Sequence, residues 1–384
     1  MHFEQIKQHI VSTPAFAIDR PRILANTQPL AALRQASGCR VLYSIKALPL
    51  IDVLTWLKPV VDGFSVSSWF EARLASEVAS GQASIHLTTP GLRDHEFADI
   101  SQRCSHISFN SLPQFQRLHG RGHGFSPGLR INPKLSFADD ARYDPCRLHS
   151  KLGIAIDTLT GRLPEGVEGL HFHTVFARSD FAPLQHTLAA LTPLLARNPQ
   201  LKWLNVGGGY LYHAIADQQA LIDSIADIKR RHALEIYLEP GNAVVNDAAC
   251  LLTSVIDRFV SDGQTVLVLD TSINHHPEVF EYQRKPPLLE ENPQGRHEAL
   301  LAGSTCLAGD LFGNYRFDTL PAVGDRLTFT NVGAYTLVKA HRFNGYDLPT
   351  LYSIDGDQIT LLKQYGYRAY RVQWALDDNH SGGV

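Results

Sequence analysis

The sequence predicts an α/β fold in which a (β/α)8 barrel is followed by an antiparallel β domain. Residues 41–241 hold eight short apolar runs, separated by stretches with helical apolar spacing. Continuous apolar runs are typical of strands that are buried on both faces of a parallel sheet. After about residue 250 the helical spacing stops, and short strand-like runs broken by turn residues take its place.

The eight barrel strands are expected at 41–47, 63–68, 85–90, 106–111, 127–133, 169–175, 203–209 and 235–241. Between them, 70–81 and 221–234 have the apolar spacing of amphipathic helices. The longest gap, 134–168, contains SKLGI (150–154) and is expected to form a functional loop plus a helix. Eight strand–helix units in succession favour closure into a barrel.

The β domain is expected to contain strands at 249–260, 265–272, 325–336, 349–356 and 358–364. The segment 277–295, rich in proline and charge, is expected to be an exposed loop, and 13–19 is a candidate to pair with this domain. We therefore assign residues 28–250 to the barrel. Residues 1–27 and 251–384 form the β-rich domain, which is expected to complete the active site and the dimer interface.

Composition narrows the function classes. A chain of 384 residues, 44% hydrophobic, is large enough for two cores. A net charge of −3 without a basic block argues against nucleic acid as a partner. No apolar run approaches the roughly 20 residues that span a bilayer, and the start does not resemble an export signal. Five scattered cysteines without a CxxC pair fit a reducing cytoplasm and argue against a zinc cluster.

Lys46 is the first candidate for chemistry. It ends the apolar run VLYSIKA (41–47), where a hydrated surface lysine would not be expected. A lysine at the mouth of a strand loses hydration, its pKa falls, and the amine becomes reactive toward carbonyl groups. The structural alternative is a lysine whose stem is buried while its ammonium reaches water.

Further candidates follow other strands of the predicted barrel, where the carboxyl ends of all strands meet. Gly207 to Gly209 end the run WLNVGGG, and backbone amides without a neighbouring Cβ can bind a phosphate. Glu239 could hold a proton on a heteroaromatic nitrogen, and His173 could lie flat over a ring. Cys306 in GSTCLAGD (303–310) is a loop thiol. An amine, a phosphate cradle, an acid and an imidazole together predict pyridoxal 5′-phosphate (PLP).

The motifs along the chain extend this prediction. They are YSIKAL (43–48), SSWFE (67–71), GLHFHT (169–174), GGG (207–209), EPG (239–241), LDTS (269–272), CLAGD (306–310), GAYT (333–336) and FNG (343–345). On these motifs the chain resembles the fold-type III PLP-dependent decarboxylases, the alanine-racemase-like group that includes ornithine, arginine and diaminopimelate decarboxylases. Within the group, CLAGD and FNG favour the carboxynorspermidine (carboxyspermidine) branch.

The resemblance implies a role for each matching residue. The implied catalytic residues are Lys46, Cys306, His173 and Glu239. The implied cofactor-binding residues are Lys46, His173, Gly207, Gly208, Gly209, Glu239, Gly241, Tyr335 and Arg130. The implied substrate-binding residues are Asp310, Cys306, Glu278, Asp270 and Asn242. No residue is expected to bind a metal.

The resemblance also implies the reaction. The α-carboxylate of carboxynorspermidine or carboxyspermidine would leave as carbon dioxide, which gives norspermidine or spermidine and places the enzyme in polyamine biosynthesis. Lys46 would carry the cofactor, and Glu239 would keep the ring nitrogen protonated as an electron sink. Cys306 of the partner subunit, or the freed Lys46, would then protonate the α-carbon. The enzyme would be an obligate homodimer with shared active sites, in which Asp310 and Lys151 pair across the interface.

Three departures from the family pattern leave the substrate open. They are Asn242 after EPG, Phe176-Ala177 after the HFHT strand, and the shortened loop His275-His276-Pro277-Glu278. The alternative is a PLP-dependent decarboxylase of another amino acid, such as a diaminopimelate-like compound. Two weaker alternatives are a PLP carrier without catalysis and a metal-dependent barrel hydrolase that uses His171 and His173.

Overall fold

The structure is a computed structural model that describes residues 3–81, 83–138, 140–215 and 218–375. Its contacts divide the chain into two compact units, one running from Leu24 to Val244 and the other formed by the segments up to Ile23 and from Val245 onward. The two divisions fall inside helices α2 (Arg20–Ser37) and α9 (Asn242–Val245). A continuous helix has no natural break, so the domain limits of 28–250 stay a prediction.

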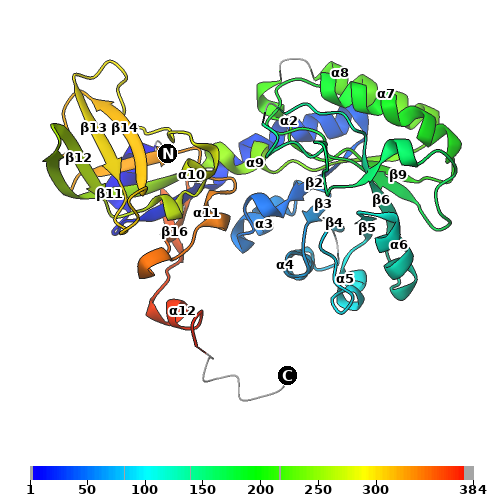
Figure 1. The fold of residues 1–384 in the computed structure, drawn as a ribbon, viewed down its shortest axis with the longest axis horizontal. Helices are drawn as coiled ribbons and strands as arrows, with labels where there is room; N and C mark the ends of the chain where they lie inside the picture. Colours follow the sequence, from blue (N-terminus) through cyan, green and yellow to red (C-terminus); the bar gives the residue numbers. More distant parts are fainter. Residues whose placement is uncertain (1–2, 82, 139, 216–217, 376–384) are drawn as a thin grey trace. The chain divides into compact units, whose positions relative to one another are not determined.

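The unit Leu24–Val244 is a closed parallel barrel (Figure 1). Its strands pair in the order β5-β4-β3-β2-β10-β9-β8-β6, and β6 pairs with β5 to close the ring. They are β2 (Arg40–Ser44), β3 (Gly63–Val66), β4 (Ser84–Thr89), β5 (His106–Phe109), β6 (Ser126–Asn132), β8 (Gly169–His171), β9 (Trp203–Asn205) and β10 (Glu235–Leu238). All eight strands match the predicted runs, which confirms the fold class of this unit.

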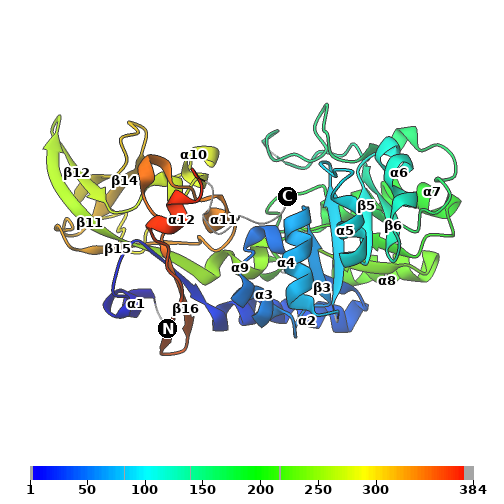
Figure 2. The ribbon, with the colours of Figure 1, turned by 90° about the horizontal axis from the view of Figure 1, so that it is seen from below.

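The helices of this unit follow the strands in sequence. They are α3 (Ile51–Leu57), α4 (Trp69–Ala79), α5 (Phe97–Arg103), α6 (Leu112–Leu118), α7 (Ala182–Arg197) and α8 (Gln219–His232). Figure 2 shows α4 and α5 side by side on the outside of the strands. Helix α4 begins at Ser68, whose hydroxyl accepts a hydrogen bond from the Glu71 amide, so this end is capped. The helices predicted at 70–81 and 221–234 are confirmed.

The predicted helix in 134–168 is wrong. Among the described residues of this segment, the structure has only strand β7 (Ile154–Ala155) and the short 3₁₀ turn η3 (Ile156–Thr158). Gly153 has φ +87°, and a Cβ there would lie 3.0 Å from the Asn132 nitrogen. Asn110, after β5, donates to the Lys151 carbonyl and accepts from the Gly153 amide. The segment is therefore a loop that is fixed to the ends of β5 and β6 by these contacts.

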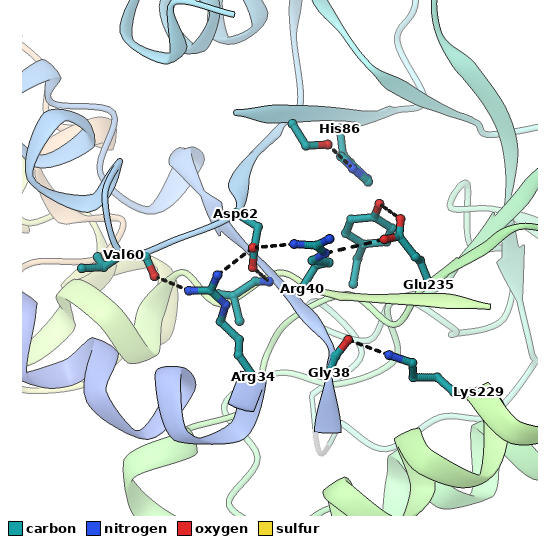
Figure 3. Close-up of polar contacts among 11 residues, drawn as sticks. Arg34, Gly38, Arg40, Val60, Asp62, His86, Lys229 and Glu235 are labelled. Carbon is teal, nitrogen blue, oxygen red and sulfur yellow. Dashed lines mark hydrogen bonds and ion pairs between the residues drawn. The ribbon is translucent and has the colours of Figure 1, made fainter. Parts of the chain in front are cut away.

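The start of the barrel strands carries a polar network (Figure 3). Asp62, before β3, accepts from Arg34 of α2 at 2.7 Å, from Arg40 at 3.3 Å and from the Val41 amide at 2.8 Å. Arg40 also reaches Glu235 at the start of β10, at 3.6 Å. These contacts join a helix and three strands at the end of the barrel opposite the carboxyl ends.

Two stacked histidines lie inside the same end of the barrel. The rings of His86 and His106 are 3.9 Å apart, and His106 also meets Trp203 edge-on at 5.2 Å. Ser84 bonds to His86, and Ser105 bonds to both Ser84 and His106. Burial lowers the pKa of His86 well below its usual value and that of His106 to about 4. Both rings are therefore neutral in the folded barrel near neutral pH.

We expect this pair to contribute to a loss of barrel stability in mild acid. Unfolded histidine titrates near pH 6.5, so the contribution is complete above that pH and is lost as pH falls toward 4. Each buried histidine contributes a slope of about 1.4 kcal/mol per pH unit, and His106, which is only half-buried, contributes less. Urea unfolding of the protein without cofactor at several pH values measures this slope. His106→Phe should reduce it, whereas exposed His95→Gln should not, and an unchanged slope in His106→Phe would contradict the assignment.

The second unit is built around one mixed sheet (Figure 1). Its strand order is β14-β13-β12-β11-β1-β16-β17, and β15 pairs with β11. The strands are β1 (Ala15–Asp19), β11 (Ala249–Ser261), β12 (Gln264–Leu269), β13 (His297–Ala302), β14 (Leu311–Phe317), β15 (Arg326–Thr330), β16 (Thr350–Asp355) and β17 (Gln358–Lys363). The predicted pairing of 13–19 is confirmed, because β1 lies between β11 and β16.

Several details of this unit differ from the sequence prediction. The sheet is not purely antiparallel, since β1 pairs with β16 and β12 with β13 in parallel. Strands β13 and β14 were not predicted. The stretch 277–295 contains helix α10 (Glu278–Tyr282), and Leu288 is buried against β15. Short helices α1 (Phe3–His9), α11 (Thr336–Lys339) and α12 (Tyr367–Arg371) complete the unit. No helix of the described residues is long and apolar enough to cross a membrane.

Candidate active site

Lys46 lies directly after β2, in the 3₁₀ turn η1 (Ile45–Ala47). The turn packs against the end of β10, where a Cβ on Gly241 would lie 3.1 Å from the Ala47 Cβ. The Lys46 side chain is open to water, but the protein atoms around it limit its hydration and lower the pKa of its amine. Glu239 opposes this shift and Arg130 reinforces it. The amine therefore has a larger uncharged, nucleophilic fraction than a surface lysine.

Glu239 follows β10 and is 7% exposed. Its Oε1 accepts a hydrogen bond from Asn205 Nδ2 at 2.7 Å, and its Oε2 lies 3.5 Å from His171 Nε2. Burial alone would raise the pKa of this carboxyl. The attraction of His171 and Lys46, with the Asn205 hydrogen bond, outweighs burial and holds the pKa well below its usual range. Glu239 is thus a buried, ionised acid at any working pH.

The glycine turn after β9 is too crowded for side chains. A Cβ on Gly208 would lie 2.1 Å from the Glu239 carbonyl oxygen, and one on Gly209 would lie 2.3 Å from that of Val175. Gly207 and Gly209 also have positive φ, +71° and +95°. The Gly207 amide donates to Asn205 and the Gly208 amide to His173, whereas the Gly209 amide has no acceptor among the described residues. This last N–H is therefore available as a hydrogen-bond donor.

His173 follows β8, and its Nδ1 accepts the hydrogen bond from the Gly208 amide at 3.2 Å. An accepting Nδ1 carries no proton, so the neutral ring has its proton on Nε2. Burial, with the nearby Lys46 and Arg130, lowers the pKa of His173 well below its usual value. The hydrogen bond from Gly208 and the nearby charges of Lys46 and Arg130 therefore both favour a neutral imidazole. The glycine turn fixes the orientation of this ring.

Arg130 is a buried cation at the end of β6. Its side chain is 8% exposed, and no hydrogen bond or ion pair to it occurs among the described residues. Burial lowers the pKa of its guanidinium, with Glu239 acting in the opposite direction, but arginine stays charged in proteins. A buried, unpaired cation is costly. Beside Lys46 and His173, this guanidinium is available to pair with an anionic group.

The barrel unit thus brings together all the implied site residues that belong to it, at the carboxyl ends of β2, β6, β8, β9 and β10. They are Lys46, Arg130, His173, Gly207, Gly208, Gly209, Glu239, Gly241 and Asn242. Asn205 and Glu71, which lie near Glu239 and Lys46, were not singled out as site residues by the sequence, and His171 was considered only as a ligand in the metal-dependent alternative. His171 and Asn205 flank Glu239, and Glu71 acts electrostatically on Lys46. Asn205 could have been found, because it is two residues before Gly207 and so on the same side of the strand.

The remaining implied site residues belong to the second unit. Cys306 is exposed on the loop between β13 and β14, and its amide donates to Asn344 Oδ1 at 3.0 Å. Asp310 is 2% exposed and holds this loop from within: its carboxylate accepts from the Ile273 amide, the Thr305 amide and the Thr305 hydroxyl. Within one chain Asp310 therefore acts as an organiser of the Cys306 loop.

The other carboxylates implied for substrate are also engaged inside this unit. Asp270 accepts from the Thr253 hydroxyl and the Ser254 amide, and contacts Thr13. Glu278 accepts from Thr336 at 2.9 Å, and burial raises the pKa of its carboxyl. Tyr335 has φ +65°, an uncommon conformation for a non-glycine residue, at the start of α11. Their roles toward substrate and cofactor remain proposals.

Comparison with known proteins decides the family. Residues 41–333 match the model described as pyridoxal-dependent decarboxylase, C-terminal sheet domain. The chain belongs to the pyridoxal-dependent decarboxylases. It is 34% identical to the carboxyaminopropylagmatine decarboxylase of Synechocystis sp., over 94% of each chain. It is 31% identical to the carboxynorspermidine/carboxyspermidine decarboxylase of Herminiimonas arsenicoxydans, over 94% of this chain and 99% of that one.

A solved member of this decarboxylase family has the same fold. The carboxynorspermidine decarboxylase of Campylobacter jejuni, solved with norspermidine, is 28% identical with a TM-score of 0.85, and covers 94% of this chain and all of that chain. The present chain is accordingly a PLP-dependent decarboxylase with a barrel and a mixed sheet unit.

The residues of the mouth fit PLP. Lys46 supplies a reactive amine, the Gly209 amide a donor for a phosphate oxygen, Arg130 a buried cation and Glu239 an ionised acid. The alternative of a metal-dependent hydrolase needs His173 as a ligand, but its Nδ1 is engaged by Gly208. Among the described residues there is no group of three or more His, Cys, Asp or Glu side chains that could hold a metal ion.

Proposed function

We propose that this decarboxylase removes the α-carboxylate of a carboxylated polyamine, carboxynorspermidine or carboxyspermidine, to give norspermidine or spermidine and carbon dioxide. The observation that carries the proposal is the similarity, over 94% of the chain, to relatives that bear these names. A second candidate substrate, carboxyaminopropylagmatine, is favoured by the relative of 34% identity.

The proposed roles follow from the geometry of the mouth. Lys46 would bind PLP covalently, Arg130 and the Gly209 amide would bind its anionic groups, and neutral His173, oriented by the Gly208 amide, would contact the ring without adding charge. When bound, PLP supplies an electron sink for the pair left by departing carbon dioxide. Glu239 deepens that sink because its carboxylate stabilises a proton on the ring nitrogen. Either Lys46 or Cys306 then delivers a proton to the α-carbon.

A substrate panel tests the proposal. Purified enzyme loaded with PLP is supplied with carboxynorspermidine, carboxyspermidine, carboxyaminopropylagmatine, meso-diaminopimelate, ornithine and lysine, and carbon dioxide is measured for each. We expect the carboxylated polyamines to have a kcat/KM at least about tenfold above the others, equivalent to about 1.4 kcal/mol of transition-state binding. Preference for carboxyaminopropylagmatine would support the second candidate. Turnover of diaminopimelate alone would overturn both.

We further propose a cytoplasmic homodimer in which Cys306 enters the partner's barrel mouth. Cys306 is exposed, yet its loop is held by hydrogen bonds to Asp310 and Asn344, as a loop that docks into another surface would be. The free state of all five cysteines fits a reducing compartment.

Mixing two defective variants tests the shared site. Lys46→Ala and Cys306→Ala should each be strongly impaired, but a mixed dimer has one site with both changes and one with neither. After subunit exchange we expect activity to recover to about a quarter of the wild-type level. The control is Lys46→Ala alone, taken through the same exchange procedure, and it should stay inactive. Without recovery in the mixed sample, given demonstrated exchange, Cys306 does not act across the interface.

A further inference from the structure

Asn205 links the glycine turn, through Gly207, to the acid Glu239. It is the last residue of β9 and 1% exposed. Its Oδ1 accepts from the Gly207 amide at 2.9 Å, and its Nδ2 donates to Glu239 Oε1 at 2.7 Å. The Glu239 amide in turn donates to the Gly207 carbonyl at 2.8 Å. The three residues therefore form a closed ring of hydrogen bonds.

This ring fixes the direction of the Asn205 amide. Its oxygen must face the Gly207 N–H and its NH₂ must face the carboxylate, because the reverse arrangement would place oxygen against oxygen and N–H against N–H. An asparagine has both groups on one short side chain. It can therefore hold the glycine turn and the acid at a set separation.

The Asn205 contact is the shortest polar contact of the Glu239 carboxylate. His171 Nε2 is 3.5 Å from the other oxygen, and neither ring nitrogen of His171 has a hydrogen-bond partner among the described residues. Burial alone would raise the pKa of Glu239. Loss of the Asn205 donor would remove a hydrogen bond to the charged form, so the pKa would rise and the carboxylate could turn away.

The turn depends on the same side chain. Without Asn205 the buried Gly207 amide would lose its acceptor, and a buried N–H without a partner destabilises the conformation that leaves it so. The neighbouring Gly208 amide positions His173. A change in the turn would therefore reach the proposed phosphate donor and the stacking imidazole together.

We propose that Asn205 is a positioning residue that sets both the ionisation of Glu239 and the shape of the phosphate-binding turn. The inference rests on the proposed placement of PLP between Lys46, the turn and Glu239. Asn205 touches neither cofactor nor substrate in this proposal. It acts through Glu239 and Gly207, and so it should influence cofactor affinity and the protonation of the ring at once.

The test compares Asn205→Ala and Asn205→Asp with Asn198→Ala. Asn198 is a matched control, because it is also 1% exposed, accepts from the Leu163 amide and donates to the Leu194 carbonyl in the same unit. Three properties are measured: the melting temperature of the protein without cofactor, the dissociation constant for PLP, and the visible absorbance of bound PLP as a function of pH.

Asn205→Ala should weaken PLP binding by about 10- to 100-fold. Asn205→Asp keeps the acceptor for Gly207 but places a second carboxylate against Glu239, so the pair retains a proton and the absorbance acquires a titration that the wild type lacks. Asn198→Ala should lower the melting temperature while leaving PLP affinity and absorbance unchanged. If both Asn205 variants have the PLP affinity and the absorbance of the wild type, the inference about Asn205 is wrong, but the proposed function is not affected. Failure of the wild type to bind PLP would instead overturn the proposed function.

Discussion

Lys46→Ala should abolish both the covalent attachment of PLP and the decarboxylase activity. The amine lies at the end of β2 with a lowered pKa, beside a buried cation and an ionised acid that together suit an anionic aldehyde. Without the amine, PLP can bind only noncovalently, and the proton that Lys46 would carry is lost. We expect turnover to fall by about 10³-fold or more. Borohydride reduction followed by mass spectrometry should detect a PLP adduct in the wild type and none in the variant.

Lys202→Ala is a suitable control for this experiment. Lys202 precedes β9 at the opposite end of the barrel and pairs with Glu168 on the surface, so its loss should leave the adduct and the activity intact. The rate at which PLP joins the cofactor-free protein should rise with pH through an apparent pKa below 10.5, because the uncharged amine reacts. An adduct that persists in Lys46→Ala, or that maps to another lysine, would remove Lys46 from its proposed role.

Much of the fold could be predicted because its signals are local. Each barrel strand is a short apolar run between polar turns, and the helix at α4 has its own capping serine, Ser68. The second unit was harder. Strands β13 and β14 contain alternating exposed and buried positions with charged residues such as Glu298 and Arg316, so they do not read as apolar runs. The parallel pairing of β1 with β16 joins residues more than 300 positions apart, which no local pattern encodes.

The site residues also divide into those that local sequence signals predict and those that depend on contacts between distant segments. Lys46, His173, Gly207 to Gly209 and Glu239 each end a predicted strand, so barrel geometry alone placed them at one mouth. Hydrogen-bond partners could not be predicted. The engagement of Asp310 by Thr305 and Ile273, and of Asn205 by Gly207 and Glu239, depends on atomic distances between separate segments. The sequence alone could not show that the Asp310 carboxylate already accepts hydrogen bonds from neighbouring residues of its own chain.

Glu239→Gln should leave PLP bound but lower turnover by about 10²- to 10³-fold, the range found when one preorganised electrostatic group is removed. Glutamine has the same shape, and its carbonyl can still accept from Asn205, so the fold and the glycine turn should persist. What disappears is the negative charge that stabilises a proton on the ring nitrogen. The electron sink weakens, and the step that loses carbon dioxide slows while substrate binding changes little. The expected signature is a lower kcat with a nearly unchanged KM.

The pH dependence separates this effect from an ordinary titration. Because the pKa of Glu239 lies well below its usual range, the wild-type carboxylate is ionised from pH 5 to 9, and no limb of the pH–rate profile should report it. Glu239→Gln should therefore lower the whole profile without moving its limbs. Glu235→Gln is the matched control, since Glu235 begins the same strand and bonds to the Tyr237 hydroxyl at the other end of the barrel. Equal kcat in Glu239→Gln and Glu235→Gln would mean that the ring nitrogen does not depend on this acid.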